Sequence, residues 1–411
     1  MTEPQPVRPA VLIVSACASH PPNTGNQRRL LTLAETLKSL GWRPVLLYTD
    51  LLGGDVAAMR QWWGADFHFV PYRPGDWRWR LKRLARRALA RWPGLRALRS
   101  KRTPPPDAPP APLRSVDDYY EPALDQRIDQ LHRDYQFAAV IGEYILTSRA
   151  FLRFAPPVRR LLDTVEVFAL GEASRHAPSA KIWVRISPAE ELRALQRGDV
   201  VIAIQDHDAK TFREAGLEPV VTVGHPVALA PAAEAVPGGA TPQLLFVASG
   251  HPFDVDGLQW FWREVYPRLA GWLPPERVVV AGGIVDALAE RPPFTFLGRV
   301  PDLDPVYRAA RVVMAPLREG TGLKIKVVEA LGQGKALVAT SFGAKGVEQG
   351  DGSALRLADS PAEFAAAIER LMRDDDECRR LMAGAREFAR QWNERQRQAL
   401  QAALQGPTKG T

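Results

Sequence analysis

Cysteine and histidine are scarce in this chain. It contains two cysteines, Cys17 and Cys378, which lie far apart in the sequence, so neither a disulfide framework nor a cysteine-based metal site is expected, and a reducing compartment fits. The seven histidines show none of the spacings that are typical of zinc ligands. No apolar run approaches about 18 residues, the length that predicts a membrane-spanning helix. Dinucleotide-binding G-x-G-x-x-G loops, P-loops and G-x-S-x-G elbows are also missing.

The N-terminus allows two interpretations. Residues 10–18 are apolar and end in A-C-A, which resembles the end of a signal peptide. The basic region before them has only Arg8, and the residues that follow favour a first strand of a sheet. We therefore expect a cytoplasmic protein.

The order of strand-like and helix-like patterns indicates parallel α/β domains. A length of 411 residues with 46% apolar content is enough for two or three domains with large cores. An Ala-, Pro- and Gly-rich stretch at 227–242 reads as a linker. We expect an N-terminal domain at 1–226, a C-terminal domain at 243–385 and a final helix at 386–411. The helices expected from periodicity and caps include 28–40, 117–135, 187–195, 208–215, 255–269, 323–331, 361–372, 377–384 and 385–405.

The segment from 312 to 342 carries the strongest functional signal. Its pattern predicts a buried strand, a glycine loop, a helix and a second strand, at 312–315, 320–322, 323–331 and 336–340. Glycines let a backbone approach a ligand closely, and the N–H groups at a helix start attract phosphate.

Three charged side chains follow the glycine loop. Lys324 and Lys326 add positive charge for phosphate, whereas a carboxylate at Glu329 would repel phosphate and suits the hydroxyls of a ribose. Phosphate at the loop and ribose at the carboxylate together describe a nucleotide diphosphate. A solvated amphipathic helix with ordinary Lys–Glu pairs would show the same spacing.

This segment resembles the donor site of retaining glycosyltransferases of family 4, which have the GT-B fold. The match is to P-L-x-x-G-x-G-x-K-x-K-x-x-E-A, which runs from Pro316 to Ala330. The wider family has two glutamates separated by seven residues, and Thr321 stands at the first of these positions here. Glu319, two residues earlier, is the candidate to replace that first glutamate at the donor sugar.

The resemblance implies two Rossmann-like domains facing a cleft, with an N-terminal acceptor domain and a C-terminal donor domain. It implies transfer of a sugar from a nucleotide diphosphate sugar to an acceptor hydroxyl with retention, and it implies no cofactor. The implied donor residues are Gly250, His251, Gly320, Thr321, Gly322, Lys324 and Lys326 for the diphosphate, Glu329 for the ribose, Glu319 for the sugar, and Arg299 and Val300 for the base. The implied acceptor-side residues are Gly25, Asn26, Arg28 and Asp163.

Some of these residues have plain structural alternatives. Gly25 fits a simple turn, His251 fits an ordinary loop, and Asp163 fits a helix cap or a turn. The family usually has D-x-H-D where this chain has Asp163 followed by Val165 and Glu166, so the histidine that grips the donor sugar in the family is absent at this place.

Two acidic triplets look like the D-x-D metal motif of another glycosyltransferase fold. They are Asp254-Val255-Asp256 and Asp302-Leu303-Asp304, and each is predicted to begin a helix. Carboxylates are favoured there by the helix dipole, so we expect no metal site.

The segment from 73 to 102 is strongly basic, with 12 Lys or Arg and one acid. Its tryptophan and leucine residues recur at helical spacing, which suits an anionic membrane surface or a lipid-linked diphosphate acceptor. The residues expected to make that contact are Trp77, Arg83, Arg86 and Arg87. Alternatives are a helix packed on the domain with solvated charges and a nucleic-acid site; we expect no nucleic acid.

We therefore expect a glycosyltransferase of surface polysaccharide or glycolipid biosynthesis, peripheral on the inner face of the membrane. A degenerate protein that only binds a nucleotide sugar is one alternative. Another is a GT-B sugar-nucleotide epimerase, which would need a pair of acid and base carboxylates in the cleft, and the sequence shows no convincing pair.

Overall fold

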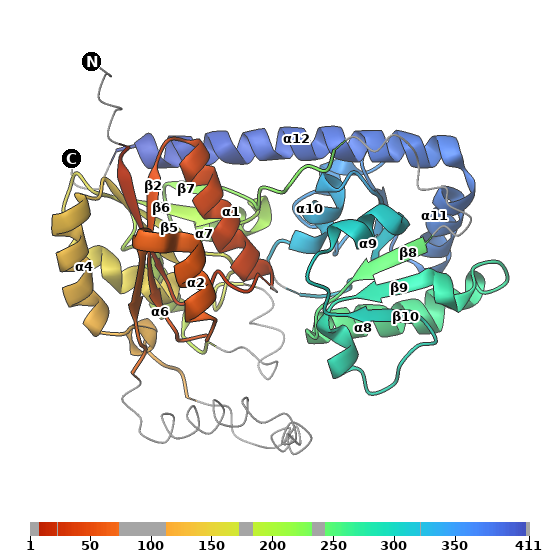
Figure 1. The fold of residues 1–411 in the computed structure, drawn as a ribbon, viewed down its shortest axis with the longest axis horizontal. Helices are drawn as coiled ribbons and strands as arrows, with labels where there is room; N and C mark the ends of the chain where they lie inside the picture. The colour runs from red at the N-terminus through yellow and green to blue at the C-terminus, as the bar shows by residue number, and fades with distance from the viewer. Residues whose placement is uncertain are drawn as a thin grey trace.

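Two parallel β-sheets, each packed with helices, form the two halves of the molecule (Figure 1). The computed structural model describes residues 8–22, 24–73, 112–171, 184–231, 243–320 and 322–407. The expected contacts at Thr321, Trp77, Arg83, Arg86 and Arg87 lie outside these residues, as does most of the expected linker. Within the described part, no helix is long and apolar enough to cross a membrane.

The N-terminal sheet has seven parallel strands in the order β3-β2-β1-β4-β5-β6-β7. All six residues of β1 are buried, as expected for a parallel strand covered on both faces. Strand order reverses direction between β1 and β4, and ligands of such sheets bind beyond the carboxyl ends of the strands at that point. The strands are β1 (Ala10–Ser15), β2 (Arg43–Thr49), β3 (Phe67–Val70), β4 (Ala139–Glu143), β5 (Arg159–Asp163), β6 (Val200–Ala203) and β7 (Val220–Thr222). The helices are α1 (Gly25–Ser39), α2 (Val56–Trp63), α4 (Ala123–Tyr135), α6 (Pro188–Leu195) and α7 (Asp206–Glu214).

The C-terminal sheet has six parallel strands in the order β10-β9-β8-β11-β12-β13. Its direction reverses between β8 and β11, so the loops after these strands lie at the expected ligand site. The strands are β8 (Gln243–Val247), β9 (Val278–Ala281), β10 (Thr295–Gly298), β11 (Ala310–Ala315), β12 (Ala336–Ala339) and β13 (Arg356–Leu357). The helices are α8 (Pro252–Trp260), α9 (Asp304–Ala309), α10 (Ile325–Gly332), α11 (Pro361–Arg373) and α12 (Asp375–Gln405).

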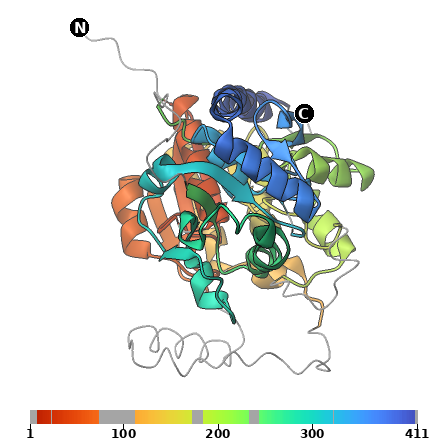
Figure 2. The same cartoon turned by 90° about the vertical axis from the view of Figure 1, so that its right-hand side faces the viewer.

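A single long helix, α12, joins the two halves. It contacts α10, α11 and β12 of the C-terminal half and β5 and β7 of the N-terminal half. Figure 1 shows it lying along both halves, and Figure 2 views it nearly end-on. Its side chains also hold the connection that follows β7, because Gln396 accepts from the Gly224 N–H at 2.6 Å and the indole of Trp392 donates to the His225 carbonyl at 2.8 Å.

The structure differs from the expected helices in three respects. Residues 117–135 divide into a 3₁₀ turn at Val116–Tyr119 and α4, with Pro122 just before α4. The helix expected at 255–269 leaves α-geometry at Phe261, six residues before Pro267, which has no N–H to donate.

The third difference is that the two helices expected at 377–405 are one. Gly384 does not end the helix; it allows a close approach, since a Cβ there would lie 1.9 Å from the Ser353 carbonyl oxygen. The sequence patterns also missed α2 and the short strand β13.

Candidate active site

The donor loop, residues 316–324, connects β11 to α10 and depends on glycine at several points. Gly320 and Gly322 have φ of 136° and 61°, in the region that side chains rarely adopt. A Cβ on Gly320 would meet the Phe253 ring at 2.9 Å. Gly257 of α8 allows the loop to pack closely, because a Cβ there would lie 2.5 Å from the Pro316 carbonyl oxygen. The loop therefore places its backbone and Lys324 beside the start of α10, and Lys326 lies in the first turn of that helix.

The two lysines of the motif have different surroundings. The Lys324 ammonium donates to the Gly322 carbonyl at 2.8 Å. Burial lowers the pKa of Lys324 to about 8; the charge of Asp208 opposes this, and the charges of Lys345 and Lys326 add to it. The Lys326 ammonium pairs with Asp254, which is only 6% exposed. Both lysines stand at the amino end of α10, so positive charge and free helix N–H groups coincide there.

Glu329 of α10 contacts the opposite domain. Its carboxylate pairs with Arg28 of α1 at 2.5 Å, and the two side chains are 17% and 29% exposed. Burial raises the pKa of Glu329, while the charge and hydrogen bond of Arg28 and the charge of Lys326 lower it. Gly25 lies at the same contact, because a Cβ there would be 3.1 Å from Ile325 Cδ1. The expected ribose residue and two expected acceptor-side residues thus meet at the junction of α1 and α10.

Tyr307 is a further polar residue in this region, and the sequence patterns did not predict it as a site residue. Tyr307 belongs to α9, and its side chain is 2% exposed. Its hydroxyl has no hydrogen-bond partner among the described residues. Burial raises the pKa of Tyr307 and the nearby charge of Glu329 raises it further, which places the ring close to that carboxylate. Nothing in its local sequence distinguishes it from a core tyrosine.

Asn26, which is expected on the acceptor side, lies next to a buried tyrosine, Tyr144. Burial raises the pKa of Tyr144, the charges of Glu166, Cys17 and Glu143 add to this, and a hydrogen bond with Asn26 lowers it. Asn26 also accepts from the Gln27 N–H at 2.9 Å at the start of α1. The carboxyl end of β4 and the start of α1 therefore share one polar cluster.

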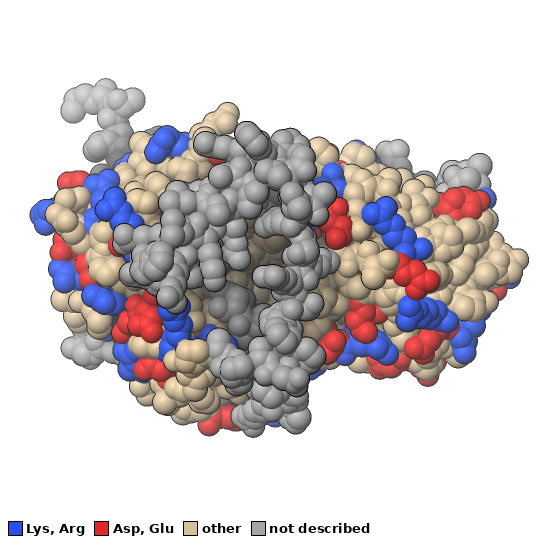
Figure 3. Space-filling view, turned by 90° about the horizontal axis from the view of Figure 1, so that it is seen from below, with Lys and Arg blue, Asp and Glu red and all other residues tan. Residues whose placement is uncertain are grey.

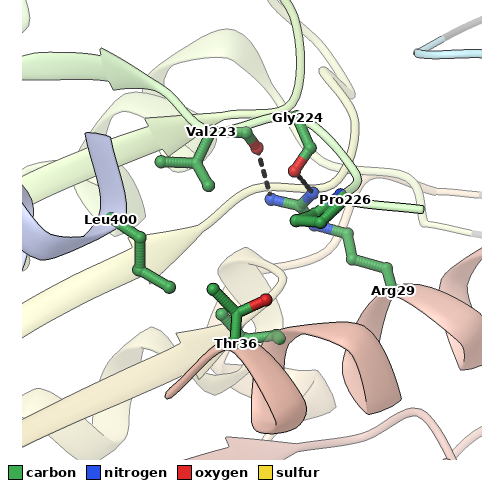
Figure 4. Close-up of a pocket in the computed structure, with 7 residues that line it drawn as sticks. Arg29, Thr36, Val223, Gly224, Pro226 and Leu400 are labelled. Carbon is green, nitrogen blue, oxygen red and sulfur yellow. Dashed lines mark hydrogen bonds between the residues drawn. The ribbon is translucent and has the colours of Figure 1, made fainter. Parts of the chain in front are cut away.

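Asp163, which is expected on the acceptor side, is held inside the N-terminal domain. Its carboxylate is buried and is bound by the Arg29 guanidinium, with Nε–Oδ2 at 2.8 Å and Nη2–Oδ1 at 2.5 Å. Arg29 also donates to the carbonyls of Val223 and Gly224 at 2.9 and 3.0 Å, as Figure 4 shows at the small pocket that it lines. Asp163 thus has a structural role: it orients the arginine that ties α1 to the end of β7.

The loop that begins at Asp163 nevertheless reaches the donor loop. Val165 has φ of 58°, a rare and strained value for a β-branched residue. Its carbonyl oxygen lies 3.3 Å from the position that a Cβ on Gly322 would take. Glu191 of α6 holds the same loop by accepting N–H groups at 2.8, 2.5 and 2.7 Å, from Phe168, Ala169 and Leu170. Val165 stands where the D-x-H-D pattern has its histidine, and its backbone faces the glycine loop.

The other predicted donor residues lie on the loops after β8, β10 and β11. His251 is the N-cap of α8, and its ring lies 4.6 Å from the Phe253 ring. A Cβ on Gly250 would lie 3.4 Å from the Gly283 carbonyl oxygen, and one on Gly283 would lie 2.8 Å from the Arg299 guanidinium. Val300 follows on the same loop, and Glu319 is exposed on the donor loop.

The acidic triplets have partners of their own. Asp254 accepts from the N–H and hydroxyl of Ser249, both at 2.6 Å, in addition to its pair with Lys326, and Asp256 pairs with Arg318 at 3.1 Å. Asp302 accepts the Asp304 N–H at 2.9 Å, as a residue at a helix start does. Among the residues that the structure describes, no group of three or more His, Cys, Asp or Glu side chains could hold a metal ion.

Comparisons with known proteins concern the fold and the C-terminal half of the chain. A family model described as "Glycosyl transferases group 1" matches residues 241–374, which contain the donor loop and α10. No curated protein matches the chain. The fold is GT-B, two Rossmann-like domains facing a cleft, as predicted. Together, the matched segment and the fold support a glycosyltransferase.

Three solved structures illustrate the similarity. The sucrose-phosphate synthase of Thermosynechococcus elongatus has 15% sequence identity and a TM-score of 0.64, covering 96% of this chain and 98% of the other. HepE of Anabaena, in complex with UDP and glucose, has 14% identity and a TM-score of 0.58, covering 95% and 99%. A Listeria monocytogenes structure assigned as a UDP-N-acetylglucosamine 2-epimerase has 10% identity and a TM-score of 0.55, covering 96% and 95%. At these identities the likeness concerns the fold.

Proposed function

We propose that the chain is a retaining glycosyltransferase of the family 4 type, which uses a nucleotide diphosphate sugar as donor. The observation that supports this best is the arrangement of the donor loop. The loop glycines lie with Lys324, Lys326 and the start of α10 at the point where the C-terminal sheet reverses direction. The Glu329 carboxylate follows one helical turn further along α10. That arrangement suits a diphosphate followed by a ribose.

In this proposal the donor residues stabilise the leaving group. Charge develops on the diphosphate as the bond to the sugar breaks, and the helix start of α10 with Lys324 and Lys326 compensates it. Glu329 holds the ribose hydroxyls, and the departing phosphate takes the proton of the acceptor hydroxyl. No protein nucleophile is required. The proposed reaction uses no cofactor and no metal; Asp254 and Asp256, which could suggest a metal site, are paired with Lys326 and Arg318.

A thermal-shift screen with UDP-, GDP- and ADP-sugars tests the donor class. A ligand present at about 100 times its Kd should stabilise the folded state by about 2.7 kcal/mol, which is readily measured as a rise in Tm. One nucleotide series should stabilise the protein clearly more than the others. If none raises the Tm at millimolar concentration, the nucleotide-sugar proposal fails.

Product analysis then separates the proposal from its alternatives. A transferase should release the nucleoside diphosphate in the presence of an acceptor, whereas an epimerase should convert the donor sugar without an acceptor. A degenerate binder should do neither while still being stabilised by the nucleotide. Nuclear magnetic resonance of the product linkage would report retention or inversion directly.

We further propose a saccharide or lipid-linked saccharide as acceptor and a location at the inner face of a membrane, in surface polysaccharide or glycolipid biosynthesis. This rests on the sequence of residues 73–102. On the face that Figure 3 shows, the described Lys, Arg, Asp and Glu side chains are interspersed. Binding to liposomes should therefore depend on Arg83, Arg86 and Arg87: it should need anionic lipid, weaken with salt and fall when the three arginines become glutamate. Equal recovery with neutral vesicles would exclude the membrane proposal.

A further inference from the structure

A third lysine, Lys345, approaches the donor loop from the loop after β12. Its ammonium lies 4.6 Å from the centroid of the Phe342 ring, and the Lys324 ammonium lies 5.0 Å from the same centroid. Two cations thus flank one aromatic ring, which attracts each of them through its electron-rich faces. The charge of Lys345 contributes to the lowered pKa of Lys324, after burial and opposed by Asp208. Two like charges beside one ring favour a bound anion.

The loop that carries Lys345 is fixed against the donor loop. The Thr340 hydroxyl donates to the Leu317 carbonyl and accepts from the Gly343 N–H at 2.9 Å. Gly343 packs so closely on the end of β11 that a Cβ would lie 2.8 Å from the Ala315 carbonyl oxygen. Gly346, with φ of 93°, packs on Leu323, where a Cβ would be 2.9 Å from Cδ1. The position of Lys345 beside Lys324 is therefore set by packing on both sides of it.

The opposite domain places buried acceptor atoms beside the loop that carries Lys345. Asp208 of α7 is 4% exposed, and Gln205, just before α7, is 3% exposed. Gln205 donates to Asp208 Oδ1 at 2.9 Å, while Asp208 Oδ2 and Gln205 Oε1 are buried without a hydrogen-bond partner among the described residues. A Cβ on Gly346 would lie 3.4 Å from Gln205 Oε1, which places this pair beside the Lys345 loop.

Charge connects the two groups across the domain junction. Burial raises the pKa of Asp208, whereas its hydrogen bond with Gln205 and the charges of His207, Lys324 and Lys345 lower it. Asp208 is thus an acid of the N-terminal domain whose charge interacts with two lysines of the donor domain. An anion that binds those lysines would compete with Asp208 for them.

We propose that Lys345 is a diphosphate-binding residue that acts together with Lys324, and that Asp208 competes with the diphosphate for both lysines. The ligand is the diphosphate of the nucleotide donor, so the inference rests on the proposed function and adds to it a residue outside the P-L-x-x-G-x-G-x-K-x-K-x-x-E-A motif. Lys324 and Lys326 belong to that motif; Lys345 follows a different strand.

Binding of inorganic pyrophosphate, measured by isothermal titration calorimetry at low and high salt, tests the proposal without a nucleoside or a sugar. Lys345→Gln should weaken binding about 10-fold or more, the effect of losing one charge-assisted hydrogen bond, and should reduce the salt dependence. Lys345→Arg should retain most of the affinity. Asp208→Asn should bind pyrophosphate more tightly than the wild type, because a competing negative charge is removed.

Lys210→Gln is the matched control, since Lys210 lies on α7 two residues after Asp208 but is 74% exposed and pairs only loosely with Glu214, at 3.7 Å. Its pyrophosphate affinity should equal that of the wild type. Wild-type affinity in folded Lys345→Gln, or no pyrophosphate binding by the wild type, overturns the assignment of Lys345. Unchanged or weaker binding by Asp208→Asn overturns the competition.

The two ligands test the two proposals separately: pyrophosphate tests the role of Lys345, and nucleotide sugars test the proposed function. If Lys345-dependent pyrophosphate binding is found but no nucleotide sugar binds, the proposed function is wrong and the lysine site stands. If nucleotide sugars bind and Lys345→Gln has no effect on them or on pyrophosphate, the proposed function stands and the role of Lys345 is excluded.

Discussion

Comparison of Glu329→Ala with Arg28→Ala should separate the ribose contact of Glu329 from the ion pair that the same carboxylate makes. In the structure, Glu329 is bound by Arg28 across the domain junction, at 2.5 Å. A ribose that binds Glu329 must therefore share the carboxylate with Arg28 or displace Arg28 from it. Hydrogen bonds to a charged partner contribute about 1.5–3 kcal/mol, so loss of the carboxylate should weaken nucleoside diphosphate binding roughly 10- to 150-fold.

Arg28→Ala removes the same ion pair and keeps the carboxylate. It should lower the free energy of unfolding by about 1–3 kcal/mol, because the largely buried Glu329 loses its partner. Ribose hydroxyls can then bind a carboxylate that no longer has a competing cation. Binding of the nucleoside diphosphate by Arg28→Ala should therefore be at least as tight as in the wild type.

Calorimetric titration of each variant with the nucleoside diphosphate and with pyrophosphate provides the comparison. Glu329→Ala should lose affinity only for the ligand that has a ribose. Glu387→Ala, which removes an exposed ion pair with Arg390 at 2.7 Å, is the matched control and should bind both ligands as the wild type does. The ribose assignment is refuted if folded Glu329→Ala binds the nucleoside diphosphate normally. It is also refuted if Arg28→Ala loses as much affinity as Glu329→Ala, because the ion pair would then be the important element.

Three further predictions concern metal, packing and pH. Activity should survive EDTA, and a loss that Mg²⁺ or Mn²⁺ restores would show that an acidic triplet binds metal. Arg29→Ala should lower the free energy of unfolding by about 3–5 kcal/mol in urea titrations, since it leaves the buried Asp163 carboxylate unpaired, and a change below about 1 kcal/mol would contradict this. Burial raises the pKa of Glu143 from 4.5 to about 8, so its contribution to stability should be full below about pH 4.5 and decline as the pH rises to about 8; Glu143→Gln should flatten this part of the pH profile relative to the wild type.

The sequence alone predicted the parallel α/β architecture and most of its elements. Strands such as 11–15 and 243–247 are short apolar runs buried on both faces, and their pattern depends on no distant contact. Ser187 with Pro188 marks the start of α6 for the same reason: the Ser187 hydroxyl accepts the Glu190 N–H at 3.2 Å, within one turn. The glycine loop with its lysines was recognisable because its residues are contiguous.

Only the tertiary structure decided which residues act together across the domains. Arg28 and Glu329 are 301 positions apart, and the charges that perturb Lys324 come from Asp208 and Lys345. A short sequence window contains no information on such pairs, because domain packing and the loops after separate strands bring them together. The same reason explains the partner of Asp163: the sequence left a ligand contact and a structural role open, and the structure pairs its buried carboxylate with Arg29 from another element. Local pattern determines where strands and helices form; long-range packing determines which of their charged ends remain for a ligand.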